Sequence, residues 1–113
     1  MKYLILLLSL LASTVVSAQP IDDDVKILAV TCHELRTENY MYASVGVAQV
    51  QGESGERFAL KLWVDRFAED ADVHADKLCK DLKQALKENT LVEVRYDLWL
   101  DSNDTLHKYI VAE

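Results

Sequence analysis

Two stretches of the chain alternate apolar and polar residues, and a third repeats its apolar residues every three to four positions. In 58–65 and 91–101 every second residue is apolar, which is typical of strands with one face on a core. Between them, an apolar stripe with lysines on the opposite side predicts an amphipathic helix. The stripe consists of Val73, Ala75, Leu78, Cys79, Leu82, Ala85 and Leu86. We expect Asp70 or Asp72 to cap the start of this helix and Asn89 to end it.

Three more segments are predicted to be strands because they are rich in β-branched, aromatic and apolar residues between polar turns. They are 25–32, 40–50 and 105–111. Gly46 lies inside the second of them and suggests a bulge or bend, because glycine is uncommon within regular strands. The sequence between Gly52 and Gly55 is the clearest turn signal in the chain.

The predicted order is three strands, one helix and two strands. It indicates a mostly β, α+β domain, a small five-stranded antiparallel barrel with its helix between strands three and four. This order resembles the oligonucleotide/oligosaccharide-binding (OB) barrel over nearly all of residues 19–113. An open antiparallel sheet with one packed helix is the alternative. The resemblance rests on order and spacing, so it transfers no function and no site residue.

The first residues have the features of a secretory signal. Lys2 precedes the apolar run Leu4 to Leu11, and Val16, Ser17 and Ala18 supply small residues for cleavage. We therefore expect a signal peptide at 1–18, a flexible leader at 19–24 and a single domain at 25–113. Export to the periplasm or the outside of the cell follows, with no transmembrane segment in the mature chain.

Charge restricts the class of partner. The full chain has a formal net charge of -7, and removing residues 1–18 takes away Lys2 and no acidic residue, which leaves -8. A negative protein without a block of lysine and arginine repels phosphate backbones, so we expect no nucleic-acid binding. A basic partner fits this charge better.

Cys32 and Cys79 are the two cysteines of the chain. In an exported domain an even number of cysteines usually means pairing, so we expect a disulfide between them. The alternative is a pair of free thiols used in redox or metal chemistry, and His33 beside Cys32 raises the possibility of a thiol nucleophile.

The predicted strands place both tryptophans among charged residues, on the faces opposite the core. If the barrel holds, Trp63, Tyr109 and Trp99 form an exterior patch, with Lys61 on the same face of its strand. Large aromatic residues ringed by polar groups favour interfaces, so these four residues are the predicted binding site. The alternative is that the leader or the helix covers the tryptophans, or that a shift of one residue exchanges the two faces.

A cluster of oxygen and imidazole side chains lies near the predicted start of the helix. Asp70, Asp72, His74 and Asp76 are weak candidates for a divalent metal site, since residues four apart share a helix face. The simpler interpretation is that these acids favour the positive end of the helix dipole. The sequence Asn103-Asp104-Thr105 also matches a glycosylation acceptor in a predicted turn.

The sequence contains no nucleophile elbow, zinc-protease helix, phosphate-binding loop or dinucleotide fingerprint. We therefore expect a non-catalytic binding or accessory module that needs no cofactor and engages a protein or cell-envelope ligand. An inhibitor or immunity-type protein for a basic secreted enzyme fits this expectation. The alternative is a small metal-dependent protein or enzyme that uses the Asp70 to Asp76 cluster. The oligomeric state is left open, including a role as a subunit of an envelope assembly.

Overall fold

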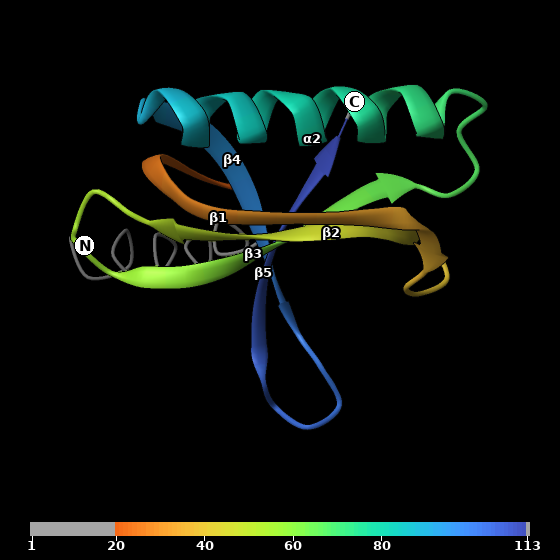
Figure 1. The fold of residues 1–113 in the computed structure, drawn as a ribbon. Helices are drawn as coiled ribbons and strands as arrows, with labels where there is room; N and C mark the ends of the chain where they lie inside the picture. The colour runs from red at the N-terminus through yellow and green to blue at the C-terminus, as the bar shows by residue number, and fades with distance from the viewer. Residues whose placement is uncertain (1–19, 113) are drawn as a thin grey trace, which may run out of the picture.

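Five strands and one helix make up the fold in the computed structural model, which describes residues 20–112. The strands are β1 (Ile21–Thr37), β2 (Tyr42–Gln51), β3 (Arg57–Asp65), β4 (Leu91–Leu100) and β5 (Leu106–Ala112), and the helix is α2 (Ala71–Glu88). The predicted order of elements is confirmed, with the helix between the third and fourth strands (Figure 1). The signal peptide predicted at 1–18 and the first leader residue, Gln19, lie outside the described residues.

The sheet is mixed, and its ladders connect in the closed order β1-β2-β3-β5-β4 and back to β1. Four ladders are antiparallel, but β3 and β5 run parallel. The prediction of an entirely antiparallel sheet is therefore wrong in one ladder. The reason is topological: strands that alternate in direction cannot close a ring of five, because an odd ring requires at least one pair that runs the same way.

The first strand begins earlier than the sequence pattern predicts. Residues 21–24 belong to β1 and pair with β4, where Ile21 lies opposite Tyr96, so the predicted flexible leader is wrong for these residues. Asp22 and Arg95 face each other in this ladder, 2.8 Å apart between carboxylate and guanidinium. The three consecutive aspartates, Asp22, Asp23 and Asp24, are compatible with a strand because none of them is buried in the core: one is exposed and two are half-buried.

The buried residues confirm the predicted alternation in β3 and part of the predicted apolar stripe of the helix. Leu60, Leu62 and Val64 are at most 1% exposed. The helix contributes Ala71, Ala75, Leu82 and Ala85, which are buried, to the same core. Val73 and Leu86, predicted to be buried, are 66% and 38% exposed. Val73 is two residues from both Ala71 and Ala75, about 200° around the helix, so it points away from the sheet.

The predicted helix ends agree with the structure in position. Asp70 occupies the N-cap, although its side chain makes no capping hydrogen bond there. Asn89 ends the helix in the left-handed conformation with φ 56° and ψ 42°, as predicted. Among the described residues, no helix is both long enough and apolar enough to cross a membrane.

The bulge predicted at Gly46 is confirmed and changes the phase of β2. Gly46 pairs with Leu62 while Ser44 pairs with Trp63, so Val45 is the extra residue. A Cβ atom on Gly46 would overlap the carbonyl oxygen of Thr31, which is why only glycine fits this close approach of β1. Before the bulge, even-numbered residues of β2 therefore lie on the face of β3 that is opposite the core.

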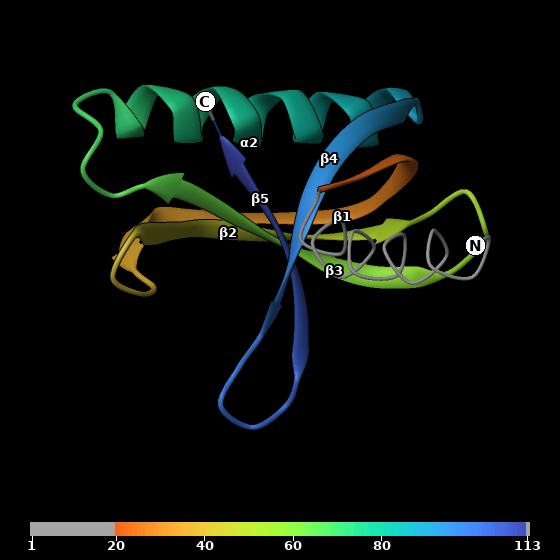
Figure 2. The same cartoon turned by 180° about the vertical axis from the view of Figure 1, so that it is seen from behind.

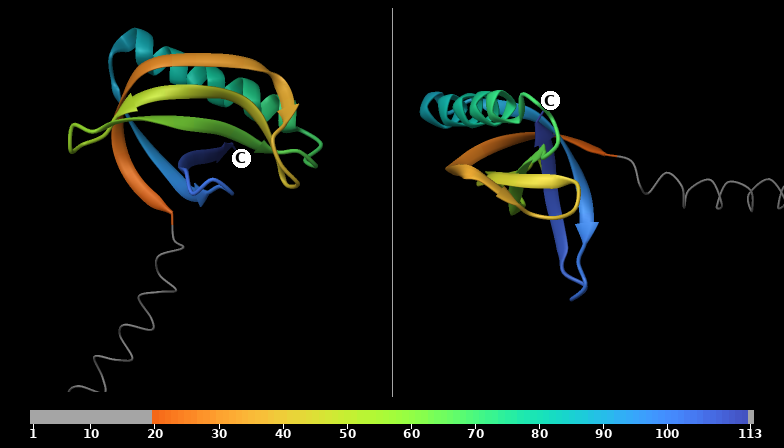
Figure 3. Two further views of the ribbon diagram at one scale, coloured as in Figure 1. Left: turned by 90° about the horizontal axis from the view of Figure 1, so that it is seen from below. Right: turned by 90° about the vertical axis from the view of Figure 1, so that its right-hand side faces the viewer.

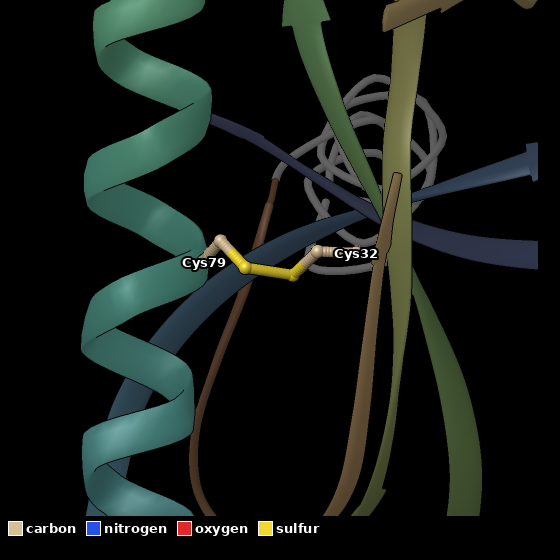
Figure 4. The surroundings of a disulfide bond; sticks show 2 residues. All are labelled: Cys32 and Cys79. Carbon is tan, nitrogen blue, oxygen red and sulfur yellow. A yellow bond between two sulfur atoms is a disulfide. The ribbon is translucent and has the colours of Figure 1, made fainter. Parts of the chain in front are cut away.

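The predicted disulfide is confirmed. Cys32 of β1 and Cys79 of α2, which are 47 positions apart in the sequence, are bonded (Figure 4). The bond fixes the helix across the strands, where Figure 3 shows it running over one side of the sheet. The described residues contain no free cysteine, so a thiolate nucleophile made by Cys32 with His33 is excluded.

Candidate functional site

An aromatic row runs across the outer face of the sheet, on the side opposite the core. It consists of Tyr42 from β2, Trp63 from β3, Tyr109 and His107 from β5, and Trp99 from β4. The register explains the row, because Trp99 lies opposite His107 and Lys61 lies opposite Tyr109. The predicted patch of Trp63, Trp99 and Tyr109 is therefore brought together.

Trp63 is the buried centre of the aromatic row rather than part of its accessible surface. Its ring stacks on Tyr109 with centroids 4.3 Å apart and on Tyr42 at 5.4 Å, and it meets the edge of Trp99 at 5.8 Å. Trp63 is 1% exposed, and among the described residues its indole nitrogen has no hydrogen-bond partner. The prediction that Trp63 is an exterior binding residue is wrong, whereas Trp99 is 37% exposed. Tyr42, Tyr109 and Trp99 pack around Trp63.

Some of the polar groups beside the aromatic row already make contacts within the protein. The ammonium of Lys61, the fourth predicted binding residue, is 3.5 Å from the carboxylate of Glu38. Burial raises the pKa of the Tyr109 phenol, and the nearby Asp97 and Tyr42 raise it further. Tyr109 is therefore a neutral hydroxyl at ordinary pH, able to donate or accept a hydrogen bond.

A polar clamp holds the hairpin that carries Trp99. His107 stacks on Trp99 with centroids 5.0 Å apart, and its Nε2 lies 2.7 Å from the carboxylate of Asp101. Asp101 also accepts the backbone N–H groups of Asn103 and Thr105 in the turn. The contact with His107, then the bond from Thr105, hold the pKa of Asp101 below its usual value of 3.8.

We expect the Asp101→Asn variant to be less stable than the wild type near neutral pH, and this difference in stability to shrink in acid. A depressed pKa contributes stability that is present above the unfolded-state value and is lost as pH falls through the folded-state value. The gap in thermal midpoint between wild type and Asp101→Asn is therefore expected to be widest near pH 6 and to shrink below pH 4. Melting curves from pH 2 to 7 measure it, with the exposed Glu53→Gln as control. A gap that stays constant with pH would show that the carboxylate charge of Asp101 does not support the hairpin.

The opposite face of the same hairpin is apolar and uncovered. Leu98, Leu100 and Leu106 are 43%, 57% and 54% exposed, although they continue the core-facing phase of β4 and β5. The hairpin extends away from α2 and the other strands, so no core remains to cover them (Figures 2 and 3). Trp99 lies on the other face of the hairpin, and the term hairpin surface here covers Trp99 and these leucines on the two faces of the projecting hairpin. Such a surface is typical of a contact site for a partner.

A pocket lies at the other end of the aromatic row. Its apolar walls come from the start of β2, the loop before α2 and the end of β5, and it has a volume of about 350 Å³. The lining residues are Met41, Tyr42, Asp65, Ala68, His74, Val111 and Ala112. Tyr42 belongs to both the row and the pocket, so the two are continuous.

The predicted metal candidates are held in contacts of other kinds. Asp70 lies 3.1 Å from Nε2 of His74, and Asp76 lies 2.9 Å from the ammonium of Lys80. Within residues 20–112 no group of three or more possible ligand residues converges on a point. The cluster is arranged as charged residues along the first turns of a helix rather than as one ligand set.

Sequence reasoning missed Tyr42 and the pocket. If residues are paired outward from the turn that joins β2 to β3, Val45 falls opposite Trp63 and Tyr42 falls on the core face. The bulge at Gly46 reverses this assignment. Gly46 is the usable signal, because the bulge that it predicts shifts the alternation of the residues before it in β2 by one position. The pocket leaves no such signal because three separate segments form it.

Comparison of the chain with protein-family models, with curated proteins and with solved structures gives no significant match.

Proposed function

We propose that this protein is an exported, non-catalytic binding module that engages a basic protein or cell-envelope ligand through the hairpin surface and the aromatic row. The observation that carries this proposal is the exposure of Trp99 and three leucines on a hairpin that projects from the sheet. A rigid, exposed aromatic residue buries much area at little cost in side-chain entropy. The Asp101–His107 clamp holds Trp99 in place before any partner arrives.

Charge supports a basic partner. Beyond the formal charge of the chain, five carboxylates line one shallow depression formed by β1, the β2–β3 turn and β4. They are Asp22, Asp23, Asp24, Glu53 and Glu93. Arg95 is paired with Asp22, which leaves the group strongly negative. The negative electrostatic field of such a surface accelerates association with a positively charged partner. An inhibitor or immunity-type protein for a basic enzyme requires this property.

We infer further that the domain is a variant of the OB-like barrel. The order β1-β2-β3-β5-β4 with the helix between β3 and β4 supports this, and the ladder between β1 and β4 favours it over an open sheet. An open sheet with one packed helix fits the list of elements and the position of the helix equally well. The assignment concerns architecture and carries no ligand with it.

The disulfide supports export. A bond between Cys32 and Cys79 fits an extracellular or otherwise oxidising compartment, because reducing cytosol keeps most thiols free. The charged and apolar start of the sequence points the same way.

The test is retention of a partner on the immobilised, disulfide-bonded protein from secreted or envelope fractions of the source cells. We expect a basic protein to be retained by wild type and about tenfold more weakly by Trp99→Ala/Leu100→Ala. Leu91→Ala, at the far end of β4 and 69% exposed, is the matched control and is expected to bind normally. Raising the salt concentration should weaken retention. A partner that is indifferent to both the double variant and salt would contradict the proposal.

A further inference from the structure

We propose that the pocket at the end of the aromatic row binds an apolar side chain that carries, or lies next to, a cationic group of the partner. This inference rests on the proposed function and specifies its second contact. The pocket is about 350 Å³, in the lower part of the range for ligand-binding cavities, and is large enough for one large side chain.

The walls of the pocket are suited to an apolar body. Tyr42 and Met41 contribute an aromatic ring and a flexible thioether, and Val111 closes the opposite side. Outside the pocket, Tyr40 is 83% exposed and Phe67 is 67% exposed, while Met41 in its wall is 54% exposed. Large apolar side chains that are exposed to solvent contribute most to the free energy of binding when a partner buries them.

The polar groups of the pocket select a cation. Asp65 lines the pocket, and one of its oxygens accepts the N–H of Phe67, which leaves the other oxygen without a hydrogen-bond partner among the described residues. His74, the other polar wall residue, lies beside the carboxylate of Asp70. No lysine or arginine lines the pocket. The nearest basic residue in sequence, Arg66, packs over the Phe67 ring and donates to the backbone of Asn39.

The position of the pocket links it to the partner surface. Tyr42 contacts both Trp63 and Tyr109 of the aromatic row, at 5.4 and 5.9 Å between ring centroids, and also forms part of the pocket wall. A partner lying along the row from Trp99 therefore meets Tyr42, which is also a wall of the pocket. Glu69 in the loop before α2 and Asp72 in the first turn of the helix add negative charge to the segment that follows Asp65, which favours a cationic partner segment.

Three small probes test this inference without knowledge of the partner. Tryptamine has an indole body and an ammonium group, indole-3-acetate has the same body with a carboxylate, and indole is neutral. We expect tryptamine to shift the amide NMR signals of the pocket residues at pH 8 and to bind about tenfold more tightly than indole-3-acetate. Indole should fall between them.

Two kinds of variant separate charge from shape. Asp65→Asn keeps the oxygen that accepts from Phe67, and is expected to reduce the tryptamine preference to less than threefold. Glu88→Gln removes an equal charge at the far end of α2 and should leave the preference unchanged. Ala68→Phe and Ala112→Phe fill the pocket from two different segments, and each is expected to abolish the tryptamine shifts. The amide spectrum of each variant also reports whether it folds.

The outcomes distinguish this inference from the proposed function. Tryptamine shifts that are absent, that map to another surface, or that survive in the folded filled variants would overturn the pocket assignment. Equal binding of tryptamine and indole-3-acetate would overturn its cation selectivity. In either case a partner whose retention depends on Trp99 still supports the binding module, whereas loss of that dependence with intact tryptamine binding removes the proposed function alone.

Discussion

Replacing both Cys32 and Cys79 by alanine is expected to lower the free energy of unfolding by about 4 kcal/mol. The disulfide closes a loop across 47 positions of sequence, from the middle of β1 to the middle of α2. On the chain-entropy model this closure restricts the unfolded chain far more than the folded one. Small domains are stable by only about 5–15 kcal/mol, so the variant is expected to be marginal. Urea denaturation followed by far-ultraviolet circular dichroism measures the loss.

The reduced wild type is the natural control for the double variant. If loop closure is the cause, the reduced protein and the variant should unfold at nearly the same denaturant concentration. A reduced protein as stable as the oxidised one would show that the packing of α2 on the sheet suffices without the bond. A variant much less stable than the reduced protein would point instead to lost packing of the sulfur atoms.

Trp63→Ala is expected to cost about 4 kcal/mol, whereas Trp99→Ala should cost less than about 1 kcal/mol. The two tryptophans lie on the same outer face, but Trp63 is 1% exposed and Trp99 is 37% exposed. Removing the first leaves a cavity between Tyr42 and Tyr109, while removing the second, which is already partly exposed, uncovers one side of His107 and one contact of Trp63. Denaturant titration of the two variants beside the wild type measures both values.

Trp63→Phe is the matched control for this pair. Phenylalanine keeps an aromatic ring in the row and removes an indole N–H that has no partner, so it should cost clearly less than alanine. Similar losses for Trp63→Ala and Trp99→Ala would mean that Trp63 is not the packed centre of the row. A loss in partner retention with Trp99→Ala at normal stability would separate the role of Trp99 from that of Trp63.

The elements could be predicted from sequence because their signals are local. The alternation in β3 gives its core face directly, since Leu60 and Leu62 are fully buried and lie two positions apart. The cysteine pairing followed from the even count and the exported context. The left-handed end of the helix at Asn89 was recognisable from residue type alone.

Exposure could not be predicted in the same way because it depends on contacts between distant segments. Leu98 and Leu106 have the phase of core residues and are nevertheless exposed, since the hairpin extends past the point where other strands could cover it. Trp63 has the phase of a surface residue and is buried, since Tyr42 and Tyr109 arrive from two other strands. The direction of β5 relative to β3 likewise follows from closure of the whole sheet.

The extra residue in β2 makes chain length at this point a determinant of the outer face. In a regular ladder that kept Val45, this residue would lie opposite Trp63, and Tyr42 and Ser44 would turn inward with Ala43 outward in their place. Trp63 would then lose its stacking partner, and the pocket would lose one wall. A one-residue insertion or deletion between Tyr42 and Ser44, which moves Tyr42 to the core face, should therefore be far less tolerated than substitutions at the solvent-facing positions of the same strand.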